Sequence, residues 1–339
     1  MVGKGGMCWN HVVIVNCVIA ICIFVCYNKK QMLRRYGMEF LYLLEKFRMP
    51  GLNELMLAVT TLGEETAFLV IGLIVFWCVD KQKGYYVMAA GFAGTMMSQI
   101  MKLSCRIPRP WVLDPQFSIL EQAREAAAGY SFPSGHTQTA VGTFGCLAAS
   151  TNRKWWRIIC IVLAALVGFS RMYVGVHTPA DVLVGAAMAC AFVWLLKKPV
   201  LQGGSKAMKI TFIALILLVF AFWAYVSFWN FPVDMDAHNM ESGLKNAYTM
   251  MGCTIGMALV YVADKRRNFS VEAVWWVQIL KAVLGLLLVL AVKEGLRAPL
   301  ELLLPLYTAR AVRYFLIVIT AGVIWPMSFQ HFSKLGAKK

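Results

Sequence analysis

The chain has 339 residues, of which 60% are hydrophobic and 15% are charged. Soluble domains carry about 25% charged residues, so this composition excludes an ordinary soluble enzyme and favours a membrane protein. The net charge of +16 does not predict nucleic-acid binding, because lysine and arginine fall mainly between apolar runs, where cytoplasmic loops are expected to be basic.

The N-terminal part of the chain, residues 1–54, contains an apolar run and an amphipathic segment. The run Val12–Tyr27 lacks the small-residue cleavage site of a signal peptide, so we interpret it as a retained first helix. Residues 36–54 mix charged residues with leucine, phenylalanine and methionine. This pattern predicts an amphipathic helix lying at the membrane interface.

Further apolar runs follow that are long enough for membrane helices, which need about 20 mostly apolar residues, or fewer when their ends are anchored. Together with the first run they predict about ten spans, and therefore an all-α polytopic membrane helical bundle. The runs cover residues 65–79, 85–104, 137–151, 156–173, 180–196, 207–229, 246–263, 273–293 and 310–328.

Basic residues fall on alternate connections between these runs, and such connections face the cytoplasm. They are Lys81 and Lys83; Arg153, Lys154 and Arg157; Lys197, Lys198, Lys206 and Lys209; Lys265, Arg266 and Arg267; and Lys334, Lys338 and Lys339. The segment 105–136, the region after Met172 and the acidic loop 234–241 then lie outside. Basic residues at 29–35 conflict with this alternation, so either the first run does not span or the amphipathic segment lies deeper.

The ten cysteines do not indicate a disulfide framework. The chain has no Cys-x-x-Cys pair, and most cysteines lie in apolar runs as small buried hydrophobic residues. The members of this group are Cys17, Cys22, Cys26, Cys78, Cys146, Cys160, Cys190 and Cys253.

The polar stretch 202–206 is the best domain boundary. Residues 55–201 before it carry every chemically suggestive side chain, and residues 207–339 after it contain about four apolar runs. We therefore expect a catalytic core over 55–201 and a C-terminal transmembrane block over 207–339, which either packs on the core or forms a contact in a homo-oligomer.

Two groups of polar residues lie at predicted outer ends of helices in this core. Lys102 ends one run, and the prolines around Arg109 stop the helix, so both cations can converge from a helix end and a loop. Ser134 is a good N-cap for the next helix, Gly135 permits close approach to the backbone, and His136 follows. A helix N-terminus with free N–H groups binds anions.

A third group contains Arg171, His177 and Asp181. Thr178, Pro179 and Asp181 form a plausible helix start, which gives Asp181 a purely structural role. A carboxylate near one imidazole nitrogen also fixes the tautomer and raises the nucleophilicity of the other nitrogen, so Asp181 can equally serve His177.

Together the three groups predict phosphoryl transfer, which needs positive charge around the equatorial oxygens and in-line attack. Three cations, neutral donors and two histidines are available, and no carboxylate cluster for Mg²⁺ accompanies them. We therefore expect no metal and no cofactor. A metal site at Asp234, Asp236 and His238 is an alternative, but the spacing suits an acidic outer loop better.

The motifs resemble the signature of the type-2 phosphatidic acid phosphatase superfamily. Its pattern is Lys, six residues, Arg-Pro; then Pro-Ser-Gly-His; then Ser-Arg, five residues, His, three residues, Asp. The matching residues are Lys102, Arg109, Pro110, Pro133, Ser134, Gly135, His136, Ser170, Arg171, His177 and Asp181. The resemblance covers about 55–200, and the stretch 60–63 also looks like bacterial members.

The resemblance implies a six-helix phosphatase core and a role for each residue. His177 should attack phosphorus and become phosphohistidine, with Asp181 orienting it, and His136 should protonate the leaving group and then activate water. The phosphoryl oxygens should be held by Lys102, Arg109, Ser134, Gly135 and Arg171. The enzyme would be a multi-pass protein of the cell membrane with its active site on the extracytoplasmic side.

The substrate and two other functional classes stay open. The expected substrate is a membrane lipid phosphate or pyrophosphate, such as undecaprenyl pyrophosphate, phosphatidic acid, phosphatidylglycerophosphate or a sphingoid-base phosphate. Pocket walls are expected from aromatic residues, which suit a lipid but select no head group. These are Trp111, Phe117, Tyr130, Phe132 and Tyr173. The same residues would serve a lipid phosphotransferase, and a non-catalytic transporter or binder would need the cations but no nucleophile.

Three arginines at the outer end of the C-terminal block, Arg297, Arg310 and Arg313, have two interpretations. They form a second contact for an anion, or they merely sit among lipid head groups, and the second interpretation is favoured.

Overall fold

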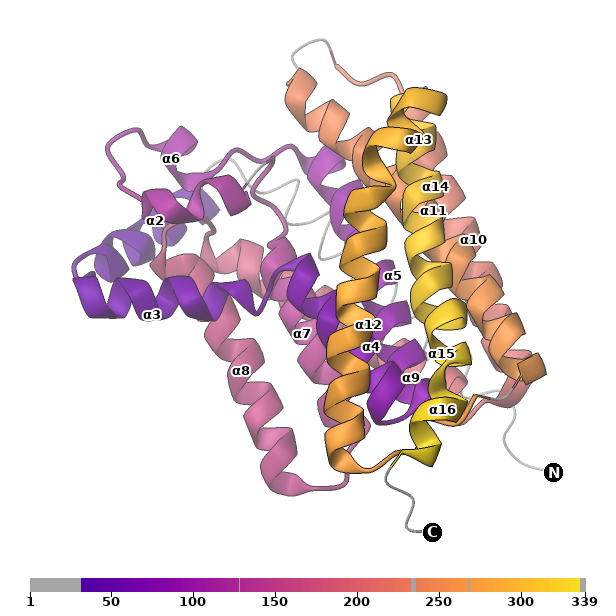
Figure 1. Cartoon of the computed structure of the whole chain (residues 1–339). Coiled ribbons are helices and arrows are strands. Elements are labelled where there is room, and N and C mark those ends of the chain that lie inside the picture. Colours follow the sequence, from indigo (N-terminus) through magenta and orange to yellow (C-terminus); the bar gives the residue numbers. More distant parts are fainter. Residues whose placement is uncertain (1–31, 128, 233–235, 268, 336–339) are drawn as a thin grey trace, which may run out of the picture. The chain divides into compact units, whose positions relative to one another are not determined.

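The computed structural model describes residues 32–127, 129–232, 236–267 and 269–335. These residues form α-helices with short 3₁₀ and π turns, and no β-strand occurs among them. The chain is therefore an all-α protein, as predicted (Figure 1). The predicted first helix over 12–27 lies outside the described residues.

The amphipathic segment forms two helices, which corrects the prediction of a single helix over 36–54. Helix α2 spans Met32–Glu45 and helix α3 spans Pro50–Thr61. Pro50 stands at the first position of α3, where its missing N–H costs nothing but its ring disfavours a helical residue before it. The proline therefore separates the two helices.

Contacts between Cα atoms divide the chain into two compact units. Unit 1 contains the described residues up to Phe68 together with Met97–Lys198, and unit 2 contains Leu69–Met96 and the described chain from Pro199 onward. The long helices of the first two hundred residues are α4 (Glu65–Cys78), α5 (Lys81–Cys105), α7 (Gly135–Ala149), α8 (Lys154–Tyr173) and α9 (Pro179–Leu201). The short helix α6 (Pro110–Leu113) and the 3₁₀ turns η1 (Glu121–Ala123) and η2 (Glu125–Ala127) lie between α5 and α7.

The C-terminal block of unit 2 consists mainly of four long helical stretches. The most extensive packing in it joins α11 and α14, where Gly252 lies so close that a Cβ would come within 2.2 Å of the Ala311 carbonyl oxygen. The elements are α10 (Gly204–Phe228), α11 (Ala237–Arg267), α12 (Trp275–Gly295), α13 (Arg297–Leu303), α14 (Leu306–Ile319), the π turn η3 (Thr320–Ile324), α15 (Trp325–Met327) and α16 (Phe329–Lys334).

Six helical stretches of the described chain are long and apolar enough to cross a membrane, or seven if α3 and α4, which are bent by 54°, form one span. They include the four predicted C-terminal spans. Of the ten predicted spans, the run 12–27 lies outside the described residues, and the runs 85–104 and 137–151 do not meet this criterion of length and hydropathy. Helix α7 has only 15 residues, and α5 contains several charged and polar side chains, so neither passes this test.

Large apolar side chains point outward along the spanning helices. Ile158 and Ile161 on α8, Leu183 on α9 and Leu217 on α10 are each more than half exposed. In water such surfaces would be unfavourable, whereas hydrocarbon tails solvate them at no cost. Their exposure is therefore consistent with a multi-pass membrane protein.

Cysteines in the apolar runs are thiols rather than bridges where the structure describes them. Cys146, Cys160 and Cys253 are buried, as predicted, but Cys78 is only partly buried and Cys190 is exposed. Cys105, at the end of α5, is disulfide-bonded, which the sequence did not lead us to expect.

Candidate active site

The residues of the three predicted motifs come together at one end of the helices of unit 1. Lys102 lies in the last turn of α5, Arg109 precedes α6, Ser134 caps α7, and Arg171 lies in the last turn of α8. His177 lies in the turn between α8 and α9, and Asp181 is in the first turn of α9. The basic connection 150–157 joins α7 and α8 at the opposite end of these helices.

The imidazole of His177 is almost wholly buried and meets a different charged group on each side. Its Nε2 lies 2.8 Å from NH1 of Arg109, and its Nδ1 lies 3.6 Å from Oδ2 of Asp181. A guanidinium can only donate, so Nε2 accepts and the proton of a neutral ring is on Nδ1, toward the carboxylate. This tautomer leaves the Nε2 lone pair as the nucleophilic position.

Asp181 holds the turn and the imidazole at once. Its Oδ2 accepts a hydrogen bond from the Thr178 backbone N–H at 2.8 Å, and Thr178 Oγ1 accepts one from the Asp181 N–H at 3.4 Å. This reciprocal pair is a capping box at the start of α9. The geometry therefore allows both the structural and the functional interpretation of Asp181, because the same oxygen faces His177.

Ser131 is a member of the site that the sequence motifs did not reveal. Its hydroxyl donates to Oδ2 of Asp181 at 2.6 Å and lies 3.4 Å from Nδ1 of His177. Its side chain is 1% exposed. Its backbone N–H donates to the Ile107 carbonyl at 2.7 Å, which ties the segment before Pro133 to the segment that follows α5.

Arg109 is fixed by the backbone of two loops. Its Nε donates to the Gly129 carbonyl at 3.0 Å, and NH1 donates to the Val176 carbonyl at 3.0 Å while also reaching His177. Burial lowers the pKa of Arg109 to about 10, although Asp181 opposes this shift. Arg109 is therefore still a cation at neutral pH and is oriented before any ligand arrives.

The same environment sets the protonation of His177. Burial, followed by the positive charge of Arg109, lowers the pKa of His177 well below its ordinary value of 6.5, and Asp181 only partly opposes this. A pKa below the ambient pH means that the ring is neutral. The ring of His177 is therefore neutral across the neutral range, with an unprotonated nitrogen.

Arg171 places a second buried guanidinium in the site. Its NH1 donates to Thr60 Oγ1 at 2.6 Å, which ties α8 to α3. Its Nε and NH2 are buried and have no hydrogen-bond partner among the described residues. Buried donors of this kind are costly unless something accepts from them, so this guanidinium is prepared for an anion.

The start of α7 provides neutral donors. Ser134 Oγ accepts from the N–H and the hydroxyl of Thr137 at 3.4 and 2.9 Å, which confirms the predicted N-cap. Lys102 lies above this turn, since a Cβ added to Gly135 would be 3.7 Å from its Nζ. The helix dipole and the lysine therefore act on the same small region.

His136 is the second histidine of the site and follows Gly135 on α7. Its Nε2 is buried and forms no hydrogen bond with the described residues. The residue packs near α3, because a Cβ on Gly63 would lie 2.8 Å from the His136 carbonyl oxygen. A buried ring nitrogen without a fixed partner can exchange a proton with a bound molecule.

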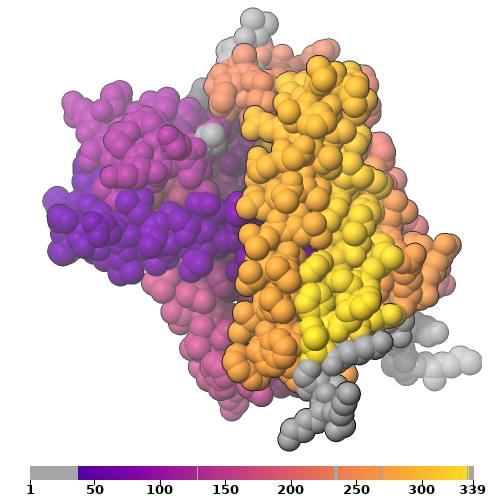
Figure 2. Space-filling view, viewed as in Figure 1, coloured from indigo at the N-terminus to yellow at the C-terminus, as the bar shows by residue number. Residues whose placement is uncertain are grey.

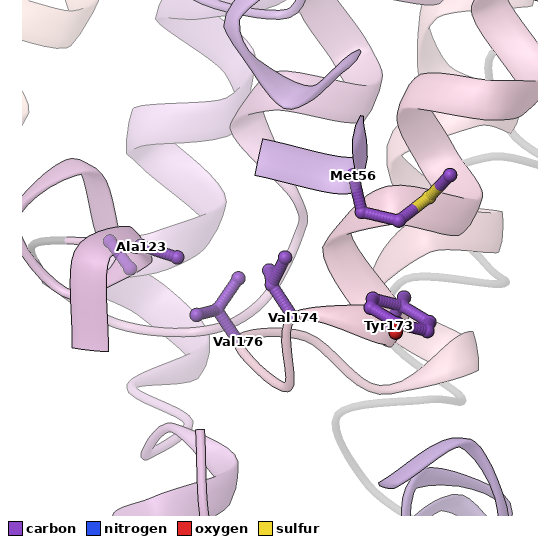
Figure 3. Packing of buried hydrophobic residues seen from close by; sticks show 6 residues of the cluster. Met56, Ala123, Tyr173, Val174 and Val176 are labelled. Atoms are coloured by element: carbon purple, nitrogen blue, oxygen red, sulfur yellow. The ribbon is translucent and has the colours of Figure 1, made fainter. Parts of the chain in front are cut away.

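A hydrophobic cluster supports the turn that carries His177. Met56 of α3 packs with Tyr173, Val174 and Val176 of this turn and with Ala123 of η1, as Figure 3 shows. Tyr173 also donates to Asn53 Oδ1 at 2.8 Å. The amphipathic N-terminal segment thus has a direct role in holding the site.

Arg48, in the link between α2 and α3, fixes the outer side of the same turn. Its Nε donates to the Tyr173 carbonyl at 3.0 Å and its NH1 to the Ser118 carbonyl at 2.9 Å. A Cβ on Gly175, whose φ is +88°, would lie 2.8 Å from NH2 of Arg48. A glycine is therefore required both for the backbone conformation and for this contact.

The predicted aromatic pocket walls have mixed positions. Phe117, Phe132 and Tyr173 are at most 3% exposed and belong to packed clusters, so they support the site from behind. Trp111 is only partly buried and lies between two cations, 5.9 Å from Arg109 and 5.2 Å from Arg124. Of the five residues, Trp111 and the half-buried Tyr130 are the more accessible.

No group of three His, Cys, Asp or Glu side chains in the described part of the chain could hold a metal ion. The alternative metal site includes Asp234, which lies outside the described residues. Asp236 instead accepts from the His238 backbone N–H at 3.0 Å and from Asn239 at 3.0 Å, which is an ordinary helix-start arrangement.

Comparisons with known proteins identify related sequences. Residues 82–202 match the model of the PAP2 superfamily, and residues 248–339 match that of the "PAP2 superfamily phosphatase, transmembrane extension". The chain belongs to the PAP2 superfamily. All eight predicted site residues lie within the first match, and the second covers most of the C-terminal block, so this protein is a membrane phosphatase of that superfamily.

Several curated proteins are similar to part of this chain. The chain is 29% identical to phosphatidylglycerophosphatase B of Bacillus subtilis in an alignment 165 positions long, which covers 44% of this chain and 76% of the relative. It is 28% identical to an undecaprenyl-diphosphatase of Sulfolobus acidocaldarius over 152 residues, which is 44% of this chain and 71% of the relative. The crystal structure of a transmembrane PAP2-type phosphatidylglycerolphosphate phosphatase from B. subtilis aligns with 55% of this chain and 94% of its own at 24% identity and a TM-score of 0.46.

Proposed function

We propose that this protein hydrolyses a membrane lipid phosphate or pyrophosphate through a phosphohistidine on His177. The observation that carries the proposal is the placement of one buried imidazole between Arg109 and Asp181. Binding an anion would need the cations alone. A neutral ring whose far nitrogen faces a carboxylate has the arrangement of an activated nucleophile.

In the first step, Nε2 of His177 forms a bond to phosphorus while the bond from phosphorus to the leaving oxygen breaks. In the free enzyme, Nε2 accepts a hydrogen bond from Arg109. The substrate phosphate accepts this hydrogen bond instead, which releases the Nε2 lone pair. The ring becomes positively charged, and Asp181 stabilises it through Nδ1–H. Burial and the nearby cations lower the pKa of His136 to about 2, so its ring is neutral in the free enzyme. It takes up a proton together with the anionic substrate and delivers it to the leaving alkoxide or phosphate oxygen.

In the second step, water attacks the phosphohistidine. His136 accepts a proton from that water, the bond between phosphorus and Nε2 breaks, and inorganic phosphate leaves. The net reaction consumes one water for each phosphate released. Both histidines return to their starting state, so no metal or cofactor is needed in this scheme.

Charge on the three equatorial oxygens is stabilised by side chains that are already in place. Arg109 and Arg171 are buried and fixed by hydrogen bonds, and Lys102 lies above the Gly135 turn. We propose that these cations, with Ser134 and the N–H groups at the start of α7, form the phosphate site. Preorganised donors of this kind commonly contribute the largest part of catalysis.

The class of substrate follows from the setting of the site and from the relatives. The named relatives act on phosphatidylglycerophosphate or undecaprenyl diphosphate. We propose the same class here, with phosphatidic acid and sphingoid-base phosphates as further candidates. We also propose that the site faces the extracytoplasmic side of the cell membrane, since the basic connection 150–157 lies at the other end of its helices.

We propose that residues 1–54 comprise an N-terminal apolar run and an interfacial amphipathic segment, that 55–201 form the catalytic core and that 207–339 form a transmembrane block. The contacts of Arg48, Asn53 and Met56 with the turn after α8 suit a segment that lies at the interface and holds the site. The transmembrane block would then pack on the core or form a contact in a homo-oligomer, and would take no part in the reaction.

A lipid phosphotransferase would use the same first step and replace water by an alcohol. The two reactions are distinguished by analysing products from a labelled lipid phosphate with and without an acceptor alcohol. Inorganic phosphate as the main product in both cases supports the hydrolase.

The direct test is His177→Ala in the purified full-length protein, with phosphate release measured over a panel of lipid phosphates. We expect activity to fall to background for every substrate. The exposed His331, changed in the same way, is a matched control that should keep the parental rate. Turnover by His177→Ala near the parental rate would exclude the mechanism.

A further inference from the structure

Unit 2 contains a cation cluster and an apolar cavity that the phosphatase chemistry does not use. The cluster joins α11, α13 and α14 at the end of the block where α11 begins, and the cavity lies further along α14. Figure 2 shows the face of the molecule that α12, α13 and α14 form, in orange to yellow. We propose that the cluster and the cavity together bind one anionic phospholipid of the membrane.

The cluster has more positive than negative charge. NH1 of Arg313 and Nε of Arg297 lie 3.5 and 3.6 Å from the same carboxylate oxygen of Glu301. Arg310 donates from Nε to the neutral hydroxyl of Thr249 at 2.6 Å. Two arginines therefore share one glutamate and the third has a neutral partner, so three positive charges face one negative charge and two remain for an anion.

Arg313 is the best evidence for a ligand. It is only 8% exposed, and its Nε is buried with no hydrogen-bond partner among the described residues. Its Nε and the remaining nitrogens of Arg310 can still donate. Two guanidinium groups with free donors match a phosphate, which accepts through several oxygens.

The apolar cavity begins one helical turn from Arg313. Ile317, four residues later and about 6 Å along α14, lines it together with Val289 of α12 and Met257 of α11. Side chains on a helix lean toward its N-terminus, so Arg313 reaches away from the cavity and toward the head-group end. A charged site and an apolar site thus follow each other along one face, as in a phospholipid.

The cavity itself has the chemistry of a lipid tail site. Its volume is about 100 Å³, its lining is wholly apolar, and it is only partly enclosed. An apolar cavity of roughly 150 Å³ stays dry and binds benzene, so this one accommodates a short stretch of an acyl chain whose remainder lies in the bilayer. The π turn η3 supplies Ala321 and Gly322 to the lining, and π turns often occur at functional sites.

The occupant is a phospholipid rather than free phosphate. Its head group matches the arginine cluster and its acyl chain matches the apolar cavity, whereas free phosphate matches the cluster alone. Glu301 neutralises only one of the three arginine charges. The remaining positive charge selects an anionic head group over a zwitterionic one. The inference does not depend on the reaction at His177, because all its residues lie in unit 2 and binding is the measurement.

The test is a titration of purified full-length protein in detergent with fluorescent phosphatidylglycerol, with phosphatidylcholine as the zwitterionic probe. We expect Arg310→Gln with Arg313→Gln to weaken phosphatidylglycerol binding at least tenfold. The double change Lys245→Gln with Lys293→Gln removes the same charge from exposed positions and should leave binding unchanged. Equal binding by the arginine variant and the parent would overturn the proposal.

The tail site is tested separately with Val289→Phe, which fills the cavity. Val283→Phe adds the same bulk at a position that is 50% exposed on the same helix, and serves as control. We expect several-fold weaker binding for Val289→Phe alone. If Val289→Phe binds normally and inorganic phosphate competes as well as the lipid, the cluster takes free phosphate and the lipid proposal is wrong.

Discussion

Nε2 of His177 lies 2.8 Å from NH1 of Arg109, and both side chains are at least 95% buried. The arginine therefore does two things to the histidine before any substrate arrives. It donates to the Nε2 lone pair, and its charge favours the neutral ring. In the proposed mechanism, a phosphate that accepts the arginine N–H releases this lone pair for the attack on phosphorus.

Replacing Arg109 by lysine should show that its shape matters as well as its charge. Arg109→Lys keeps one positive charge but cannot reach Gly129, Val176 and a phosphate together. We expect kcat to fall by about 10²-fold or more, which is the usual cost of one preorganised donor. Arg106→Lys, at an adjacent position outside the phosphate site, is the control. Parental kcat in Arg109→Lys would show that only charge is needed.

The pH dependence tests the same contact. Because the pKa of His177 lies well below 6.5, the nucleophile is neutral at all pH values above that pKa, and the acidic limb of kcat/KM should fall at lower pH than 6.5. Arg109→Gln removes a positive neighbour that lowers this pKa. The pKa of His177 then rises, and the acidic limb of the residual activity should move to higher pH. Movement to lower pH would contradict this account.

Ser131 should act as a positioning residue through Asp181. Ser131→Ala removes a 2.6 Å hydrogen bond to the Asp181 carboxylate. It leaves unchanged every side chain that we propose contacts the phosphate. We expect kcat to fall roughly tenfold with little change in KM, since ground-state binding is preserved. Ser131→Thr keeps the hydroxyl and should recover most of the rate, and Ser150→Ala, at the far end of α7, should match the parent. A rise in KM with unchanged kcat would argue for a binding role instead.

Helix α9 contacts the start of α7 so closely that one added methyl group, in Gly185→Ala, should lower both stability and activity. A Cβ on Gly185 would lie 2.7 Å from the Ser134 carbonyl oxygen, so Gly185→Ala must displace the cap of α7. We expect a loss of about 1–3 kcal/mol in stability and a clear loss of activity. Gly51→Ala is the control, because nothing lies within 4 Å of its Cβ and alanine favours the helix. Thermal unfolding in detergent, followed with phosphate release, measures both effects.

Much of the site could be predicted from the sequence because its residues lie at helix ends. Proline and the capping residues around Arg109, Ser134 and Asp181 mark those ends, and helix ends of one bundle meet at one face. The roles of these residues remain proposals, but the structure brings them together. Ser131 could not be found in this way, because a single hydroxyl in a loop carries no periodic or spacing signal. Thr60 was marked only as part of the stretch 60–63, and its contact with Arg171 was not predicted.

The fold was predicted less well where short or polar helices are held by neighbours. Helix α7 is too short to span by itself, yet its buried face is packed against α8. The amphipathic pattern continues on both sides of Pro50, so it does not reveal that one helix ends and another begins there. Hydropathy measures transfer into lipid, whereas these elements are stabilised by tertiary packing.

The central claim is the covalent intermediate on His177, and rapid quenching in alkali tests it most directly, because phosphohistidine is stable in base and labile in acid. Purified protein is mixed with a lipid phosphate labelled in the phosphate group, and labelled protein is mapped to a peptide. We expect alkali-stable label on His177, absent in His177→Ala, and label that persists longer in His136→Ala because water is no longer activated. A protein that releases phosphate at the parental rate without ever carrying label on His177 would contradict the account.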